Sequence, residues 1–317
     1  MILNKRKIVL VGTGMVGMSF AYSALNQAVC DELVLVDIDR HRAEGEAMDL
    51  NHGVAFAPSS MKIYAGDYSD CADADIVVIC AGVSQKPGES RLDLLKRNTA
   101  VFQSIIGPIT HSGFSGIFLV ATNPVDIMTR VTYELSGFNS NRVFGTGTTL
   151  DTARLRYLLG DYFTVDPRNV HAYVIGEHGD SEFVPWSQAM VATKSVADIC
   201  EQSQGKFCLE EMQTISVEVR DAAQKIIEAK RATYYGIAMA VSRIAECVMK
   251  DEHAMLPVSV LLEGQYGLDG LCLSVPSIVG ENGVETVLEI PLDEKEHQAL
   301  LSSAQQLKEV IATLDLP

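Results

Sequence analysis

KIVLVGTGMVG, residues 7–17, joins a short apolar run to a G-x-G-x-x-G turn. The run is typical of a buried parallel strand, and the pattern of residues 15–28 favours a helix after it. In such a unit the first glycine permits a tight turn, the second leaves room for a phosphate, and the third lets the helix approach the sheet. The helix N-terminus adds free N–H groups and a partial positive charge. The stretch therefore predicts a dinucleotide-binding unit.

A second apolar run, residues 33–37, ends in an acidic residue, Asp37, 20 residues after Gly17. A carboxylate there suits the 2′- and 3′-hydroxyls of a ribose and would repel a 2′-phosphate, which favours NAD over NADP. The alternative is a structural turn without a ligand, which the spacing of Asp37 disfavours. The residues expected to bind NAD in this unit are Gly12, Gly14, Met15, Val16, Gly17 and Asp37.

Strands and helices continue to alternate over the first half of the chain, which favours a doubly wound parallel sheet of the Rossmann type. Helices are expected between most of the strands, including 40–50 and 90–111. The further strands are expected at residues 61–65, 75–81, 116–121 and 142–145.

The pattern changes after residue 147, with a helix expected over 150–162 and a long helical stretch over 210–250. A final amphipathic helix begins near Asp293. Gly-Glu-Asn-Gly at 280–283 is typical of a hairpin turn. Antiparallel strands are expected at about 257–264, 271–279 and 284–290.

A chain of 317 residues exceeds the usual size of one domain, so two domains are expected. We predict an NAD-binding Rossmann domain over residues 1–146 and an α+β substrate domain over residues 147–317. The chain shows no flexible linker, so we expect a tight interface with the active site between the domains.

The net charge of −16 disfavours binding to nucleic acids and to anionic membranes. An anionic cofactor and substrate must then be held by local arginines and backbone N–H groups. The seven cysteines are scattered and form no C-x-x-C pair, which indicates reduced thiols in a cytoplasmic protein and no metal site. We expect no signal peptide, because the first apolar run ends in the glycine turn, and no membrane span.

Two further motifs suggest a reaction centre. IGEHGD at 175–180 contains His178, and LDTAR at 150–154 contains Asp151 and Arg154. A carboxylate bonded to one ring nitrogen of a histidine fixes its tautomer and raises its affinity for a proton. The alternatives are a polar surface histidine and an exposed ion pair between residues three apart on a helix.

These motifs, the glycine turn and the segment 85–91 follow one another in the order found in the L-lactate/malate dehydrogenase family. The chain resembles that family over nearly its whole length, and its details resemble the bacterial lactate-specific branch. The resemblance implies hydride transfer between NADH and a 2-oxo acid, with His178 as proton donor and acceptor and Asp151 as its partner. It assigns the substrate carboxylate to Arg154, in a bidentate fork. It gives Arg91, on a closing loop, the role of polarising the substrate carbonyl.

Other roles also rest on the resemblance. It places Asn123 near the nicotinamide and the substrate, Thr233 beside the substrate methyl group and Ile237 behind the nicotinamide. Turn chemistry before Pro124 and plain helix packing are the alternatives. The remaining expected cofactor residues are Gly82, Asn98 and Thr122.

Gln85 favours pyruvate and lactate as the substrates. Malate-specific relatives have an arginine at this position for the second carboxylate, and a neutral glutamine would leave that charge buried and unpaired, at a cost of several kcal/mol. The alternatives are bulkier 2-oxo acids, as in the hydroxyisocaproate dehydrogenase branch, and then malate. A structural nucleotide-binding protein on the same fold is a further alternative, against which the retained reactive residues argue.

Arg156 indicates a control site. It lies two residues after Arg154, about 200° around the helix, so it points away from the reaction centre. In activated bacterial members of the family, residues matching Arg156 and His171 bind fructose 1,6-bisphosphate across a subunit interface, and the resemblance implies a homotetramer. A solvated arginine is the alternative. The chain departs from its relatives at Pro185 and over 194–208, which leaves the shape of those loops open.

Overall fold

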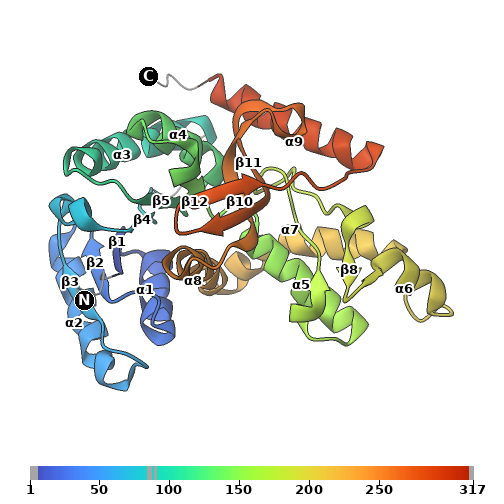
Figure 1. Ribbon diagram of the computed structural model, residues 1–317, viewed down its shortest axis with the longest axis horizontal. Helices are drawn as coiled ribbons and strands as arrows, with labels where there is room; N and C mark the ends of the chain where they lie inside the picture. The colour runs from blue at the N-terminus through green and yellow to red at the C-terminus, as the bar shows by residue number, and fades with distance from the viewer. Residues whose placement is uncertain (1–5, 84–87, 89–90, 314–317) are drawn as a thin grey trace.

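One sheet of nine strands runs through the part of the chain that the computed structural model describes, residues 6–83, 88 and 91–313. Its order is β12-β11-β10-β6-β5-β4-β1-β2-β3 (Figure 1). The strands of the N-terminal half are β1 (Lys7–Val11), β2 (Glu32–Val36), β3 (Lys62–Ala65), β4 (Ile76–Ile79), β5 (Ile117–Val120) and β6 (Val143–Gly145).

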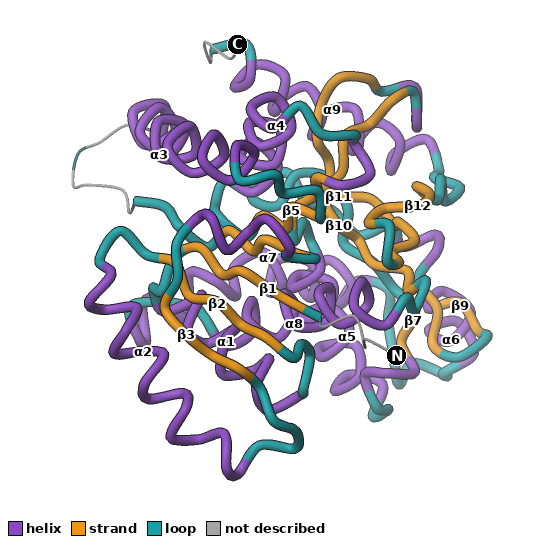
Figure 2. Tube along the Cα trace, turned by 60° about the vertical axis from the view of Figure 1, so that its left-hand side comes forward, coloured by secondary structure: helices purple, strands orange, loops and turns teal. Residues whose placement is uncertain are grey.

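Strands β1 to β6 are mutually parallel and have the order 3-2-1-4-5-6 of a doubly wound dinucleotide-binding sheet. Helices cover both faces: α3 (Arg91–His111) and α4 (Val125–Ser136) lie above the sheet in Figure 1, with α1 (Met15–Gln27) and α8 (Tyr235–Lys250) below it. Helix α2 (Arg40–Gly53) lies against β2 and β3 (Figure 2). Because both faces are covered, every residue of β1 is buried, and the predicted parallel sheet is confirmed.

The glycine turn has the geometry that its sequence predicts. Gly12 has φ +101°, and a Cβ atom there would lie 2.6 Å from the backbone nitrogen of Ala81, after β4. A Cβ atom at Gly17 would lie 2.0 Å from the carbonyl oxygen of Gly12. The loops after β1 and β4 therefore meet at the point where the strand order reverses, which is where such sheets bind ligands.

Three antiparallel strands of the C-terminal half continue the same sheet: β10 (Ala254–Glu263), β11 (Asp269–Gly280) and β12 (Gly283–Val287). Strand β10 joins the parallel part where Ser259 pairs with Gly145 of β6. Gly280 pairs with Gly283, so the predicted hairpin at 280–283 is confirmed. The division of the chain between residues 146 and 147 stays a prediction, because the strands on its two sides share one sheet.

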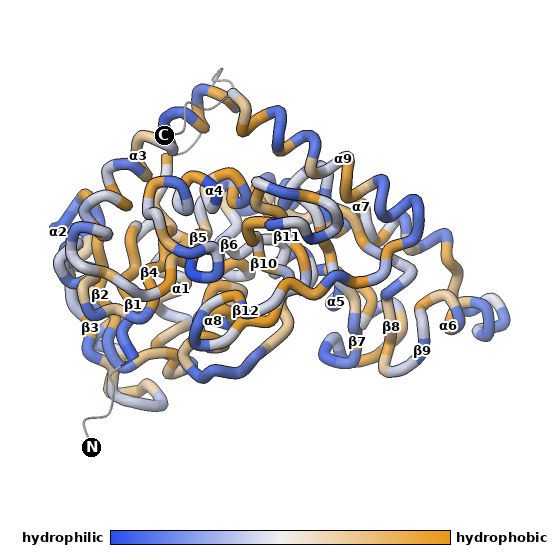
Figure 3. Tube along the Cα trace, turned by 45° about the horizontal axis from the view of Figure 1, so that its top comes forward, coloured by the Kyte–Doolittle hydropathy of each residue, from blue (hydrophilic) through white to orange (hydrophobic). Residues whose placement is uncertain are grey.

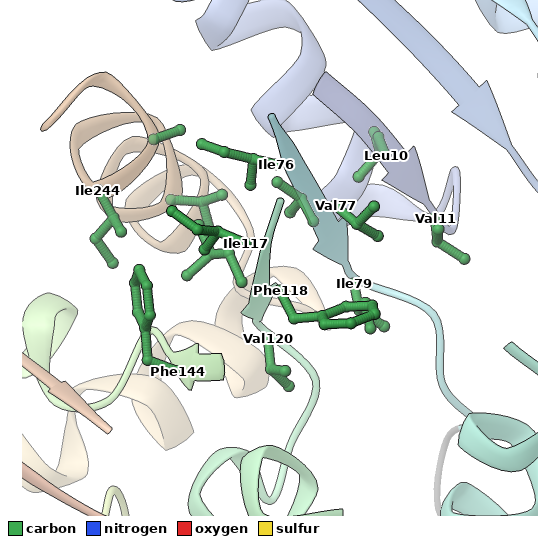
Figure 4. Close-up of a cluster of buried hydrophobic side chains, with 14 of the residues drawn as sticks. Leu10, Val11, Ile76, Val77, Ile79, Ile117, Phe118, Val120, Phe144 and Ile244 are labelled. Atoms are coloured by element: carbon green, nitrogen blue, oxygen red, sulfur yellow. The ribbon is translucent and has the colours of Figure 1, made fainter. Parts of the chain in front are cut away.

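The main hydrophobic core lies between the sheet and its helices and includes residues from both halves of the chain. Figure 4 shows Ile76 of β4 and Ile117 of β5 near Ile244 of α8 and Phe144 of β6. Hydrophobic residues concentrate in the strands, whereas α9 (Glu294–Ile311) alternates between hydrophilic and hydrophobic residues, as expected of an amphipathic surface helix (Figure 3). Helix α9 begins where predicted, because Asp293 and Glu296 form a reciprocal capping box.

A second, smaller core lies under α5 (Thr149–Phe163) and α7 (Glu210–Lys230). It is flanked by α6 (Val196–Gln202) and by a small antiparallel sheet. The strands of that sheet are β7 (Val170–His171), β8 (Met190–Val191) and β9 (Lys194–Ser195). The sequence did not predict this sheet, because strands of two residues are too short to show alternation.

The prediction of one helical stretch over 210–250 is wrong. Helix α7 ends at Lys230, Arg231 adopts a left-handed conformation with φ +72°, and α8 begins only at Tyr235. The connection contains neither glycine nor proline, so the sequence carries no turn signal there. Among the helices of the described residues, none combines the length and the apolar character needed to cross a membrane.

Candidate active site

Helix α5 holds Asp151 and Arg154 against the loop that carries His178. The Nδ1 atom of His178 lies 2.6 Å from Oδ2 of Asp151, and Nη1 of Arg154 donates to Oδ1 of the same carboxylate at 2.8 Å. Asp151 is 1% exposed. A carboxylate offers only lone pairs, so Nδ1 must carry a proton and Nε2 is left for chemistry. The structure therefore brings these three predicted residues into one cluster.

The charges around His178 favour its protonated form. Burial opposes protonation of the ring, but the charge of Asp151 and its hydrogen bond outweigh burial and raise the pKa of His178 to about 9. Burial also favours neutral Asp151, but the neighbouring imidazolium and guanidinium hold the pKa of this carboxyl below its usual value. At neutral pH the pair is thus an imidazolium and a carboxylate, which is the form that donates a proton.

Glu182 is a buried acid at the same centre that the sequence interpretation missed. Its side chain is 5% exposed, and its Oε2 lies 3.9 Å from Nδ1 of His178. Burial and the charge of Asp151 raise the pKa of Glu182 to about 8. Its neutral form therefore prevails at pH 7. The sequence could not predict this role, because an acidic residue four positions after a loop histidine carries no pattern that indicates its burial.

Asp126, in the first turn of α4, was also missed. It is 2% exposed, and its Oδ2 accepts the backbone N–H of His178 at 2.8 Å. Its Oδ1 accepts the hydroxyl groups of Ser259 at 2.5 Å and Ser274 at 3.2 Å. Burial raises the pKa of Asp126 to about 6, although these hydrogen bonds favour the carboxylate.

The glycine turn and Asp37 fit the NAD that the family binds. A Cβ atom at Gly14 would meet no described atom within 4 Å, so the space above the turn is open, and no described side chain caps the N-terminus of α1. Asp37 accepts the backbone N–H of Thr13 at 2.7 Å. Burial opposes ionisation of Asp37, but N–H groups of Asp39 and Thr13 hold its pKa below the usual value, which keeps a carboxylate for the ribose. Beside it, the apolar side chain of Ile38 is fully exposed, and the sequence interpretation did not single it out.

Four further predicted cofactor residues, Gly82, Asn98, Thr122 and Asn123, lie close together beyond the carboxyl ends of β4 and β5. Oδ1 of Asn98 accepts the N–H of Val83 at 2.9 Å, and its Nδ2 donates to the carbonyl of Asn123 at 3.3 Å. A Cβ atom at Gly82 would lie 2.7 Å from Cγ2 of Thr122. This edge of the sheet is the one on which the Gly12 turn lies.

The structure describes the other predicted substrate and nicotinamide residues only in part. Thr233 is half-buried in the non-helical connection before α8, not on a helix as predicted, and Ile237 is half-buried in the first turn of α8. Arg91 is the first residue of α3, and nothing is described of its side chain. Gln85 lies outside the described residues.

Arg156 and Arg154 diverge, as the helical angle predicts. Nε of Arg156 donates to the carbonyl oxygen of Ala172 at 3.1 Å, and its guanidinium lies 5.2 Å from the ring centroid of Tyr173. His171, exposed on β7, immediately precedes Ala172 and Tyr173 in the chain. The predicted control residues therefore lie on α5 and β7, two elements that contact each other.

Comparison with known proteins finds two family models that match consecutive parts of the chain. Residues 6–145 match the model of the lactate/malate dehydrogenase NAD binding domain, and residues 148–315 match that of the alpha/beta C-terminal domain. The L-lactate dehydrogenase of Geobacillus kaustophilus (strain HTA426) is 52% identical over 306 residues, which cover 96% of each chain.

Two solved structures share the whole fold. The minor L-lactate dehydrogenase of Enterococcus mundtii in its ligands-bound form has a TM-score of 0.97 and 44% identity, over 99% of this chain and 100% of that one. MGS-M5, a lactate dehydrogenase enzyme from a Medee basin deep-sea metagenome library, has a TM-score of 0.95 and 50% identity, over 97% and 98%. The chain therefore belongs to the lactate/malate dehydrogenase family of NAD-dependent oxidoreductases.

Proposed function

We propose that this chain is an L-lactate dehydrogenase that interconverts pyruvate and L-lactate. The single observation that carries the proposal is the buried Asp151–His178 pair beside Arg154, since it provides a proton donor next to a group that binds carboxylates. The relatives cited above carry the same name, which supports the same activity here.

The proton moves through Nε2 of His178. NADH, when bound at the glycine turn, supplies the hydride. The imidazolium donates its Nε2 proton to the carbonyl oxygen of pyruvate, and Asp151 stabilises the charged ring until transfer. In the direction of lactate oxidation, neutral Nε2 accepts the hydroxyl proton.

Arg154 binds the substrate carboxylate in this proposal. Its side chain is 13% exposed and one of its nitrogens is already held by Asp151, which fixes the plane of the guanidinium. A fixed guanidinium can donate two parallel hydrogen bonds to a carboxylate in a bidentate fork. Arg91 would polarise the carbonyl, Gln85 would select the methyl group, and Asn123 and Thr233 would line the pocket.

Three wider properties are part of the proposal. Fructose 1,6-bisphosphate binds at Arg156 and His171, which is supported by the contact of Arg156 with Ala172, the residue after His171. The enzyme acts as a homotetramer, because in the family that site lies between subunits. It works in the cytoplasm, where its seven free thiols stay reduced.

The test is NADH oxidation with pyruvate, oxaloacetate and 2-oxoisocaproate as separate substrates, each with and without fructose 1,6-bisphosphate. We expect fast turnover of pyruvate, slow turnover of the other two, and activation by the bisphosphate. A preference for oxaloacetate would overturn the role of Gln85. Pyruvate turnover that ignores the bisphosphate when the protein is dilute would overturn only the control site.

A further inference from the structure

Asp126 is a buried carboxylate to which the proposed mechanism gives no role. Burying an ionisable side chain is costly unless hydrogen bonds compensate for the lost water. Asparagine could accept the same backbone N–H without this cost. The presence of an acid at 2% exposure beside the reaction centre therefore needs a reason.

Three elements converge on this carboxylate. It lies on α4, three residues after Asn123, and receives the hydroxyl groups of Ser259 on β10 and Ser274 on β11. Its third donor is the backbone N–H of His178 itself. The loop has a second attachment nearby, because Gly176 and Ser274 exchange backbone hydrogen bonds of 3.0 and 3.1 Å. Asp126 thus links the cofactor side of the sheet to the peptide group that places the imidazole.

We propose that Asp126 is a positioning residue for proton transfer, which fixes the backbone of His178 and stabilises its imidazolium through a second buried negative charge. The role within catalysis rests on the proposed function. Asp151 holds the ring of His178, and Asp126 holds its main chain. The two carboxylates therefore restrain the same residue at both ends.

The charges facing Asp126 are consistent with this role. Outside its own helix, the titratable groups that interact with Asp126 include His178 and Glu177 of the loop and the neutral thiol of Cys272 on β11, and Arg130 of α4 acts on that thiol. Glu177 repels the carboxylate and His178 attracts it. Because the pKa of Asp126 is raised only to about 6, the group is ionised at pH 7. Its negative charge in turn raises the pKa of His178.

Asp126→Asn tests the proposal, because it keeps the size and one acceptor oxygen and removes the charge. The first measurement is an NMR titration of the His178 ring, assigned by its loss in His178→Asn, without substrate. We expect the pKa of His178 to fall by about half a unit to one unit. The second measurement is the steady-state kinetics of pyruvate reduction as a function of pH. At neutral pH we expect kcat of the variant to be about tenfold below that of the wild type, with a smaller change in KM, because the proton donor is misplaced.

Asp75→Asn is the matched control. Like Asp126, Asp75 accepts a backbone N–H, that of Lys7 at 2.7 Å, but it is only half-buried and precedes β4 at the opposite end of the sheet. We expect the His178 titration in this variant to match that of the wild type.

An unchanged His178 pKa in folded Asp126→Asn would overturn the proposal, even if the variant melts at a lower temperature. If this variant fails to fold, Ser259→Ala replaces it. Loss of that donor raises the pKa of Asp126 but leaves the group ionised where His178 titrates, so we expect kcat to fall by a smaller factor with KM little changed. An unchanged kcat in this variant would contradict the proposal. Wild-type protein that titrates as expected but does not reduce pyruvate would instead overturn the proposed function.

Discussion

At the scale of single residues, the proposed mechanism makes the His178–Asp151 pair determine the pH range of catalysis. In that mechanism pyruvate reduction requires protonated His178, whose pKa is about 9. A raised histidine pKa keeps the donor charged at neutral pH and removes it only in alkaline solution. We expect kcat/KM for pyruvate to be flat near neutrality and to fall tenfold per pH unit above about 9. A decrease of kcat/KM that begins near the ordinary histidine pKa of 6.5 would contradict the raised pKa of His178.

Asp151→Asn should separate the two directions of the reaction. Without the carboxylate, the pKa of His178 falls and the neutral ring prevails at pH 7, so pyruvate reduction should drop on the order of a hundredfold or more. Lactate oxidation, which needs a neutral base, should lose less. The measurement is kcat in both directions. Asp166→Asn is the control, because Asp166 pairs with Arg168 at 2.9 Å on the exposed surface, and its loss should change neither direction.

At the scale of elements, the glycine turn holds α1 against the sheet. Gly17→Ala would place a Cβ atom 2.0 Å from the carbonyl oxygen of Gly12, and the obstacle is backbone. The helix must move, so we expect a loss of about 1–3 kcal/mol in the free energy of unfolding and weaker NADH binding. Urea titration and NADH fluorescence measure the two effects.

Gly45→Ala is the control for that substitution. Gly45 lies inside α2, and a Cβ atom there would meet no described atom within 4 Å. Alanine is a better helix former than glycine, so the free energy of unfolding of this variant should rise by up to about 1 kcal/mol. Its NADH binding should equal that of the wild type. Equal behaviour of the two variants would show that close packing at Gly17 does not matter.

The elements that could be predicted are those whose pattern is local. The apolar runs of β1 and β2 and the capping box of α9 each carry their signal within a few residues. The end of α7 could not be predicted, because Arg231 takes a left-handed conformation that the sequence does not favour at an arginine. At the site, Asp151 and His178 follow from motifs. The role of Asp126 depends on contacts with residues 52 to 148 positions away, which only the fold brings together.

At the scale of the whole molecule, the two halves share one core. Val241, Ile244 and Val248 of α8 are buried in the cluster that surrounds β1 and β4. A fragment of residues 1–146 lacks α8 over its core and exposes the edge of β6. We expect its free energy of unfolding to be lower by on the order of 5–10 kcal/mol, which is comparable with the whole stability of a domain. We expect the fragment to show no cooperative urea transition by circular dichroism. A cooperative transition with NADH binding would show that the first half folds alone.

The second core under α5 and α7 has a consequence for how the enzyme ages in use. Helix α5 supplies Asp151 and Arg154 from its first turns, and its later turns bury Leu155, Leu159 and Phe163 in that smaller cluster. Local opening there needs less free energy than opening the shared core. A stored or heated preparation should therefore lose pyruvate reduction while it still binds to a nucleotide-affinity resin. Binding to such a resin would then overestimate how much active enzyme remains.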